Sequence, residues 1–252
     1  MIAGRHALVT GGGSGVGKAI ALALADVGVA VTISGRREAV LAEVAKESDR
    51  IFAIAADVTN ETEMAALYEK AEAARGPFDI VVANAGMAGS APAHKTSPAD
   101  WRRTLDVNLT GAFLTVKPAL AGMIARKAGR IIFVASTAGL KGYAYVAPYV
   151  AAKHGVVGLM RALATETAKS GVTVNAVCPG FVETDMLEGS VQRIVGKTGR
   201  SADEARASLA ATNPQGRFIQ PEEVAAAVLW LCSDAARSIT GQAISISGGE
   251  TW

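Results

Sequence analysis

Residues 147–155, APYVAAKHG, carry two side chains whose types and spacing favour proton transfer. Tyr149 and Lys153 are four positions apart in a stretch of helical composition, so both lie on one face of the expected helix. A phenol ionises at about pH 10, and a cation close to its oxygen favours the phenolate. We therefore expect Lys153 to lower the pKa of Tyr149, a candidate general acid and base. The spacing alone also suits a half-buried tyrosine beside a solvated lysine.

The elements that position these residues are short apolar runs alternating with alanine-rich helical stretches. The runs cover residues 6–10, 29–34, 50–56, 79–85, 130–136, 172–177 and 243–247. They are almost continuously apolar, as in strands that are covered on both faces. The alternation predicts an α/β fold, a single-domain Rossmann-like doubly wound parallel sheet of about seven strands with helices on both faces.

One segment breaks this rhythm. Residues 182–218 are mostly polar, have helical tendency and follow the sixth expected strand. The segment is either a flap over a ligand or a mobile surface excursion, and we expect it to cover a substrate. Nothing else indicates a linker, so we expect one dinucleotide-binding and catalytic domain over residues 1–252.

Composition limits the classes of partner. The 25 basic and 23 acidic residues nearly cancel and aromatic residues make up 5%, which argues against nucleic acid and favours a small-molecule ligand. The three histidines, His6, His94 and His154, have no metal-binding spacing. Cys178 and Cys232 are expected to fill core positions.

The first residues, MIAGRHALVTGGG, lead directly into the first expected strand, without a secretory leader. We find no run of 18 or more apolar residues that predicts a membrane span. The expected setting is therefore the cytoplasm, without membrane attachment.

A glycine-rich turn joins the first expected strand to a helix in LVTGGGSGVGKAIALALA, residues 8–25. Glycine permits a tight turn and close approach of a phosphate, and the following helix offers free N–H groups. A pyrophosphate is therefore the expected ligand. Residues 12–18 also match the opening of a P-loop, but Ala19 stands where a magnesium ligand is needed. The turn fits T-G-x-x-x-G-x-G better, with Thr10, Gly11, Gly15 and Gly17.

The end of the second expected strand bears on cofactor choice. Dinucleotide folds that prefer NAD usually place an acidic residue there, which binds the ribose 2′-hydroxyl and repels a 2′-phosphate. This chain has Gly35 followed by Arg36 and Arg37, and a guanidinium binds phosphate through paired hydrogen bonds. We predict NADP as the preferred cofactor and NAD as the alternative, with Arg36 as the main contact unless the arginines are simply solvated.

Further residues complete a recognisable pattern. The sequence NAG occupies residues 84–86 after the fourth run, Ser136 follows the fifth, Tyr149 is thirteen residues on, and Lys153 four further. With the glycine turn, this set strongly resembles the short-chain dehydrogenase/reductase family over essentially the whole chain.

The resemblance implies a role for each residue. Tyr149 would be the general acid and base, and Lys153 would lower its pKa and hold the nicotinamide ribose. Ser136 would orient the substrate oxygen, and Asn108 in DVNLTG would support a proton-relay water. The residues expected along the cofactor are Gly11, Gly13, Ser14, Gly15, Val16, Gly17, Arg36, Asp57, Val58, Asn84, Ala85, Gly86, Tyr149, Lys153, Pro179, Gly180, Val182 and Thr184.

The implied reaction is hydride transfer between NADP(H) or NAD(H) and a small-molecule ketone or secondary alcohol. A 3-oxoacyl carrier-protein reductase of the same family, a non-catalytic dinucleotide-sensing protein and a nucleotide phosphotransferase remain alternatives. The substrate stays open. Its pocket is expected to include Met87, His94, Leu140, Tyr143, Phe181 and Met186. The resemblance also implies a homotetramer.

Overall fold

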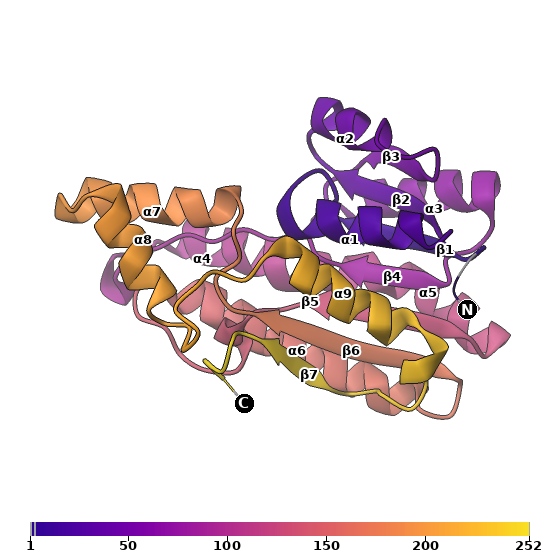
Figure 1. The fold of residues 1–252 in the computed structure, drawn as a ribbon. Coiled ribbons are helices and arrows are strands. Elements are labelled where there is room, and N and C mark those ends of the chain that lie inside the picture. The colour runs from indigo at the N-terminus through magenta and orange to yellow at the C-terminus, as the bar shows by residue number, and fades with distance from the viewer. Residues whose placement is uncertain (1, 3, 252) are drawn as a thin grey trace.

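The computed structural model describes residues 2 and 4–251. Its centre is a seven-stranded parallel sheet in the order β3-β2-β1-β4-β5-β6-β7 (Figure 1). The strands are β1 (His6–Thr10), β2 (Ala30–Gly35), β3 (Ile51–Ala55), β4 (Ile80–Ala83), β5 (Gly129–Val134), β6 (Val172–Pro179) and β7 (Ala243–Ile246). Each falls within or overlaps one of the apolar runs, so the expected parallel sheet is confirmed.

Helices cover both faces of this sheet, because side chains alternate along each strand. The helices are α1 (Gly15–Asp26), α2 (Glu38–Ala45), α3 (Glu61–Arg75), α4 (Pro98–Leu105), α5 (Gly111–Arg126), α6 (Ala147–Thr167), α7 (Asp185–Thr198), α8 (Ala202–Ala210) and α9 (Pro221–Cys232). Leu8 of β1 belongs to the core with α3, α5 and α6 on one face, whereas Val9 belongs to the core with α1, α2 and α9 on the other. This doubly wound arrangement confirms the predicted fold class.

The polar segment after β6 forms a lobe made of α7 and α8 that projects beyond the end of the sheet (Figure 1). A parallel bridge between Val182 and Ile219 joins the two chain segments at its base. Leu187, Val191 and Ala205 are buried within the lobe. The segment therefore has an ordered helical structure with apolar contacts of its own.

One helical stretch is long and apolar enough to cross a membrane by length and composition. It runs over Pro98–Arg126 and includes α4, a π-helical segment (Asp106–Thr110) and α5. Val116, Ala119 and Met123 of this stretch belong to the core under the sheet. Core packing therefore accounts for its apolar composition.

Candidate active site

A cavity of about 930 Å³ lies at the carboxyl ends of the central strands β1 and β4. Strand order reverses between these two strands, which is where open parallel sheets bind ligands. Every residue that the sequence predicted for catalysis or cofactor binding lines this cavity. The folded chain therefore brings together residues that are far apart in the sequence, while their individual roles stay predictions.

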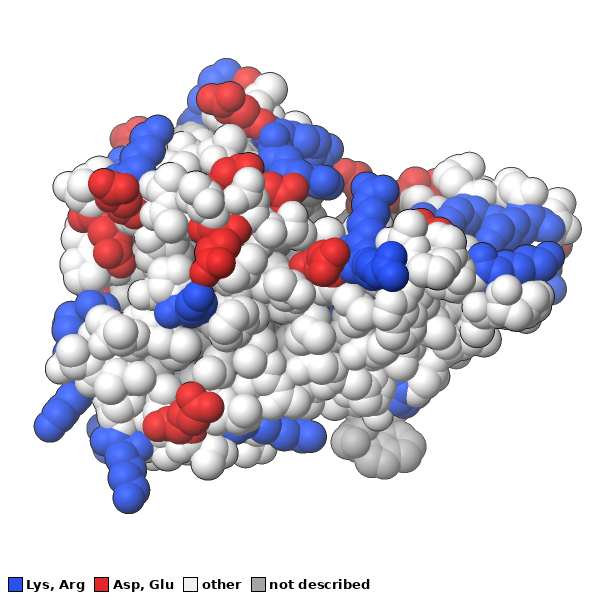
Figure 2. All heavy atoms as spheres, turned by 180° about the vertical axis from the view of Figure 1, so that it is seen from behind, with Lys and Arg blue, Asp and Glu red and all other residues white. Residues whose placement is uncertain are grey.

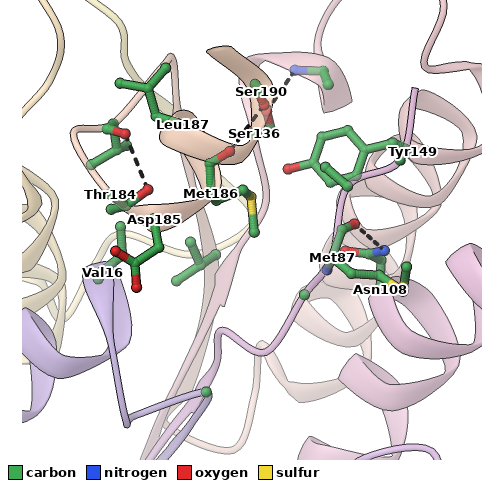
Figure 3. A pocket seen from close by; sticks show the side chains of 18 of the residues that line it. Val16, Met87, Asn108, Ser136, Tyr149, Thr184, Asp185, Met186, Leu187 and Ser190 are labelled. Carbon is green, nitrogen blue, oxygen red and sulfur yellow. Dashed lines mark hydrogen bonds between the residues drawn. The ribbon is translucent and has the colours of Figure 1, made fainter. Parts of the chain in front are cut away.

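Two elements position the candidate catalytic residues. Tyr149 and Lys153 lie on the first two turns of α6, and Ser136 follows β5 as the N-cap of a short 3₁₀ turn, Thr137–Gly139. The Lys153 Nζ donates a hydrogen bond to the carbonyl oxygen of Val134 at 2.8 Å and lies 5.6 Å from the centre of the Tyr149 ring. The Tyr149 hydroxyl points into the cavity on the side of Ser136 (Figure 3).

The electrostatics of this pair differ from the sequence prediction. Burial raises the pKa of Tyr149, and its hydrogen bond with Ser136 opposes that shift only in part. Burial also lowers the pKa of Lys153 to about 8. The predicted lowering of the Tyr149 pKa is therefore wrong, because desolvation of the phenolate outweighs the Ser136 hydrogen bond that opposes it. Tyr149 carries its proton at neutral pH.

Asn108 holds the Met87 backbone in place at the edge of the site. It is 1% exposed and lies in the π-helical segment between α4 and α5. Its Nδ2 donates to the carbonyl oxygen of Met87 at 2.9 Å, and its Oδ1 accepts from the Met87 N–H at 3.2 Å. These two bonds fix the segment after β4 against the helix, beside Lys153.

The glycine turn has the features that a dinucleotide pyrophosphate requires. Helix α1 begins at the cavity with Ser14 as N-cap, and no side chain in the described part of the chain caps its first N–H groups. A Cβ at Gly17 would overlap the carbonyl oxygen of Gly11, so close packing of turn and helix excludes a side chain there. Free N–H groups at the positive end of a helix suit a bound phosphate. The turn thus fits a dinucleotide.

Asn84 ties the end of β4 to this turn. Its Nδ2 donates to the carbonyl oxygen of Thr10 at 2.9 Å, and the Thr10 hydroxyl accepts from the backbone N–H groups of Asn84 and Ala85. The sequence predicted Asn84 along the cofactor; the structure shows that its amide also holds two cavity walls together.

Two arginines and one aspartate line the adenosine end of the cavity. Arg36 and Arg37 are exposed, and the Arg37 Nη2 donates to the Ser14 Oγ at 3.4 Å. Burial raises the pKa of Asp57, but hydrogen bonds from Thr59 and the Arg36 charge outweigh it and hold that pKa below its ordinary value. The sequence analysis favoured Arg36, whereas the contact with the glycine turn is made by Arg37.

The P-loop alternative has no support in the geometry. Lys18, the residue that would reach a phosphate, pairs with Glu47 at 2.8 Å and lies outside the cavity lining. Ala19 packs against the apolar core beneath α1. The phosphotransferase hypothesis therefore lacks both its cation and its metal ligand.

Tyr143 was expected at the substrate pocket, but its contacts with Glu250, Thr137 and Lys141 were not predicted. Tyr143 lines the cavity, and its hydroxyl donates to Glu250 Oε1 at 2.5 Å and lies 2.6 Å from Thr137 Oγ1. Lys141 pairs with the same carboxylate at 3.1 Å, and the Glu250 side chain is 2% exposed. Burial and the Glu250 carboxylate raise the pKa of Tyr143. The end of the chain thus fixes one wall of the substrate side, a contact without a local sequence signal.

The lobe forms the opposite wall of the substrate side. Met186, Leu187 and Ser190 of α7 lie across the cavity from Tyr149 and Asn108 (Figure 3). Of the residues expected around the substrate, Met87, Tyr143, Phe181 and Met186 line the cavity. His94 and Leu140, which were also expected there, lie outside its lining: His94 is on the 3₁₀ turn Ala93–Lys95, and Leu140 directly follows the turn Thr137–Gly139.

Among the described residues, no cysteine or histidine lines the cavity. Cys178 and Cys232 are buried and free, and burial raises the pKa of Cys178 to about 11 and that of Cys232 to about 12. Within residues 2 and 4–251, no group of histidine, cysteine, aspartate and glutamate side chains could hold a metal ion.

The fold and cavity define a dinucleotide-binding α/β oxidoreductase, and comparison with known proteins names its family. The short chain dehydrogenase family model matches residues 5–194, so the chain belongs to that family. The chain is 39% identical to D-beta-hydroxybutyrate dehydrogenase of Cupriavidus necator, covering 99% of this chain and 98% of that protein. It is 41% identical to cis-4-hydroxycyclohexanecarboxylate dehydrogenase of Sinomonas cyclohexanicum, over 98% and 96%.

Comparison with solved structures leads to the same family. The crystal structure of a single-residue variant of actinorhodin polyketide ketoreductase with NADPH matches with a TM-score of 0.95 and 38% identity, over 98% of this chain and 97% of that chain. The predicted family and the predicted class, an oxidoreductase acting on alcohol and carbonyl groups, are confirmed.

Proposed function

We propose that the protein transfers a hydride between NADP(H) and the carbonyl carbon of a small-molecule ketone, with Tyr149 as general acid and base. One observation supports this proposal: Tyr149, Ser136 and the buried Lys153 all line a single cavity. The glycine turn, where no side chain caps the first N–H groups of α1, lines the same cavity. The test follows absorbance at the nicotinamide band with a panel of ketones. Loss of NADPH absorbance with a ketone is expected, and no change with any ketone would contradict the proposal.

Each side chain of the site has one role in this hydride transfer. A bound nicotinamide supplies or accepts the hydride. The protonated Tyr149 donates to the substrate oxygen as negative charge develops there, and Ser136 holds the same oxygen by a hydrogen bond. Lys153, anchored on Val134, places a positive charge beside the phenol. Asn108 keeps the Met87 segment in position. Burial raises the pKa of Tyr149, so the phenol holds the proton that it donates in this step.

We propose NADP as the preferred cofactor, with NAD as the alternative. Support comes from Arg36 and Arg37 at the end of β2 and from the NADPH present in the related ketoreductase structure. The test compares kcat/KM for NADPH and NADH in the wild type, Arg36→Ala and Arg37→Ala. A charge-assisted hydrogen bond is worth roughly 1.5–3 kcal/mol, so the arginine that binds phosphate should contribute about 10-fold or more to the preference. Better use of NADH by the wild type would overturn it.

Two alternatives have specific tests. A 3-oxoacyl carrier-protein reductase of the same family is compatible with the fold and would show turnover with 3-oxoacyl thioesters. A dinucleotide sensor would bind NADPH without turning over any ketone. The presence of Ser136, Tyr149 and Lys153 together around one cavity favours an enzyme.

We place the protein in the cytoplasm as a single-domain homotetramer that acts without membrane or nucleic acid. The nearly balanced charge, +2 at pH 7, supports the absence of nucleic acid. The core packing of Pro98–Arg126 supports the absence of a membrane span. In this proposal residues 182–218 cover the substrate as part of the same domain.

A further inference from the structure

The last residues of the chain place a buried carboxylate behind the substrate side of the cavity. The acidic side chains visible in Figure 2 lie on the surface, several of them beside Lys or Arg side chains, whereas the Glu250 side chain is 2% exposed. Its Oε2 has no hydrogen-bond partner among residues 2 and 4–251. A buried charge with an unpartnered oxygen destabilises a fold. Its presence at the edge of a cavity therefore calls for a functional explanation.

The turn that carries Glu250 holds the carboxylate in a fixed place. Gly248 has a φ of +62°, a left-handed conformation that glycine adopts without strain. The Ser247 hydroxyl accepts a hydrogen bond from the Thr251 N–H at 3.2 Å, which closes the turn. The Glu250 Oε2 lies against Gly180 of the cavity wall, where a Cβ would come within 3.0 Å of it.

The hydrogen bonds of Tyr143 fix the direction of its single proton. A carboxylate accepts hydrogen bonds and donates none, so the Tyr143 proton points to Glu250 Oε1. Thr137 Oγ1 lies 2.6 Å from the phenol oxygen and must therefore donate to it. Burial and the Glu250 carboxylate raise the pKa of Tyr143, so the phenol keeps its proton. Tyr143 is left with an acceptor lone pair and no proton to donate to a ligand.

This acceptor belongs to the reacting end of the cavity. Thr137 directly follows Ser136, and Tyr143 and Tyr149 line the same cavity. A negative charge on Tyr149 also raises the pKa of Tyr143, so the two phenols are near enough to interact. A substrate oxygen held by Tyr149 and Ser136 therefore brings its neighbouring groups to the side of Tyr143.

We propose that Glu250 is a positioning residue: by accepting the Tyr143 proton it makes this wall a hydrogen-bond acceptor, which selects ketones that carry a hydroxyl group near the carbonyl. This inference rests on the proposed function and adds the substrate class to it. A hydroxyl group can donate to the Tyr143 oxygen, whereas a methyl group in its place cannot. A second carbonyl there would oppose lone pair to lone pair.

The kinetic test uses three substrates that differ only in the group beside the ketone: 3-hydroxybutan-2-one, 3-methylbutan-2-one and butane-2,3-dione. The wild type should prefer the hydroxyketone to the methyl ketone in kcat/KM by about 5-fold, the effect of one neutral hydrogen bond. Tyr143→Phe should lose this preference. Glu250→Gln keeps an Oε1 acceptor and should keep the wild-type ratios. Glu250→Leu frees the Tyr143 proton, so its ratio of dione to hydroxyketone should rise by about 5-fold.

A structural role for Glu250 would lower kcat/KM for the three substrates together and leave their ratios unchanged, which would overturn the proposal. Equal use of the hydroxyketone and the methyl ketone by the wild type would also overturn it. Glu222→Leu is the matched control, because it removes an exposed glutamate outside the cavity lining, and it should change none of the values. If Glu250→Leu does not fold, Tyr143→Phe and a binding measurement still decide.

The binding measurement separates this inference from the proposed function. Ligand-observed NMR titrates the NADPH-saturated protein with butane-2,3-diol and with 3-methylbutan-2-ol, which reduced nicotinamide cannot oxidise. The diol should bind about 5-fold more tightly to the wild type, and the two alcohols should bind equally to Tyr143→Phe. Equal affinities in the wild type would overturn the proposal. If no ketone is reduced but the diol difference is present, the proposed function fails while this site stands.

Discussion

Lys153 is a buried cation whose environment differs strongly from water. Its ammonium group is buried, has the Val134 carbonyl oxygen as its hydrogen-bond acceptor, and has a pKa lowered to about 8. Burial of a cation destabilises the folded protein when the cation is charged. The site therefore keeps a costly charge beside Tyr149, which is typical of a functional rather than a structural position.

This burial predicts a pH dependence of stability. The pKa of Lys153 is about 8 in the folded state and 10.5 for an ordinary lysine. Between these values the unfolded chain binds more protons, so the free energy of unfolding rises with pH. The Lys153 contribution to that rise is about 3 kcal/mol at most. Urea unfolding from pH 7.5 to 10.5 should show it in the wild type and not in Lys153→Met.

The Lys153→Met comparison has a built-in control. Cys178 and Cys232, whose buried thiols make stability fall with rising pH, are present in both proteins. The difference between the two pH profiles therefore reports the titration of the lysine together with its coupling to Cys178. Profiles that run parallel across this window would show that Lys153 is not desolvated as described.

Residue types predict part of the site and geometry supplies the rest. Tyr149, Lys153 and Ser136 are identifiable because their types and spacing form a chemical set. Glu250 is not, because it meets Tyr143 across 107 positions of the chain, and a buried carboxylate looks like any surface glutamate in the sequence. The sign of the Tyr149 pKa shift also depends on burial, which spacing does not reveal.

At the scale of elements, buried parallel strands have a strong sequence signal and helix irregularities do not. All seven strands are visible as apolar runs, and the five inner ones are buried on both faces over most of their length. The π-helical segment Asp106–Thr110 has no such signal, since one additional residue in a turn changes neither composition nor apolar period. Yet this segment presents Asn108 to the Met87 backbone. Its role becomes apparent only from the folded chain.

The contact between the glycine turn and α1 gives a prediction for that element. In Gly17→Ala, the new methyl group would overlap the Gly11 carbonyl and approach the Asn84 amide. We expect a loss of about 1–3 kcal/mol in the free energy of unfolding from this overpacking, together with weaker NADPH binding because the turn must shift.

Gly196→Ala is the matched control for this substitution. Gly196 lies within α7, and a Cβ there has no atom within 4 Å. Alanine should stabilise that helix by about 0.5–1 kcal/mol. Denaturant unfolding and NADPH titration measure both effects. Equal stability of Gly17→Ala and the wild type would contradict the packing described for the turn.

At the scale of the whole molecule, the proposed homotetramer requires an apolar contact surface. Trp101, Phe113 and Ile124 are each about 40% exposed on the outer side of Pro98–Arg126. Large apolar side chains that remain exposed are candidates for contact with another protein. We assign this face to the proposed homotetramer.

Light scattering at micromolar concentration tests this assignment. The wild type should have the mass of a tetramer of 25.8 kDa chains, and Phe113→Glu should dissociate it because a charge would be buried without a partner. Val27→Glu is the control, since Val27 is exposed to a similar degree at the end of α1. A monomer mass for the wild type would contradict the assembly, and an unchanged mass in Phe113→Glu would contradict its placement.

The central claim is that the Tyr149 hydroxyl donates the proton at a hydride-transfer site. Tyr149→Phe removes that hydroxyl without altering the glycine turn or the Lys153 anchor, so the decisive measurement is NADPH turnover in this variant together with its NADPH dissociation constant. We predict that turnover slows by about 100-fold or more, the magnitude expected of a lost general acid, with NADPH affinity unchanged within about 3-fold. Retention of more than about a tenth of wild-type turnover would contradict the account.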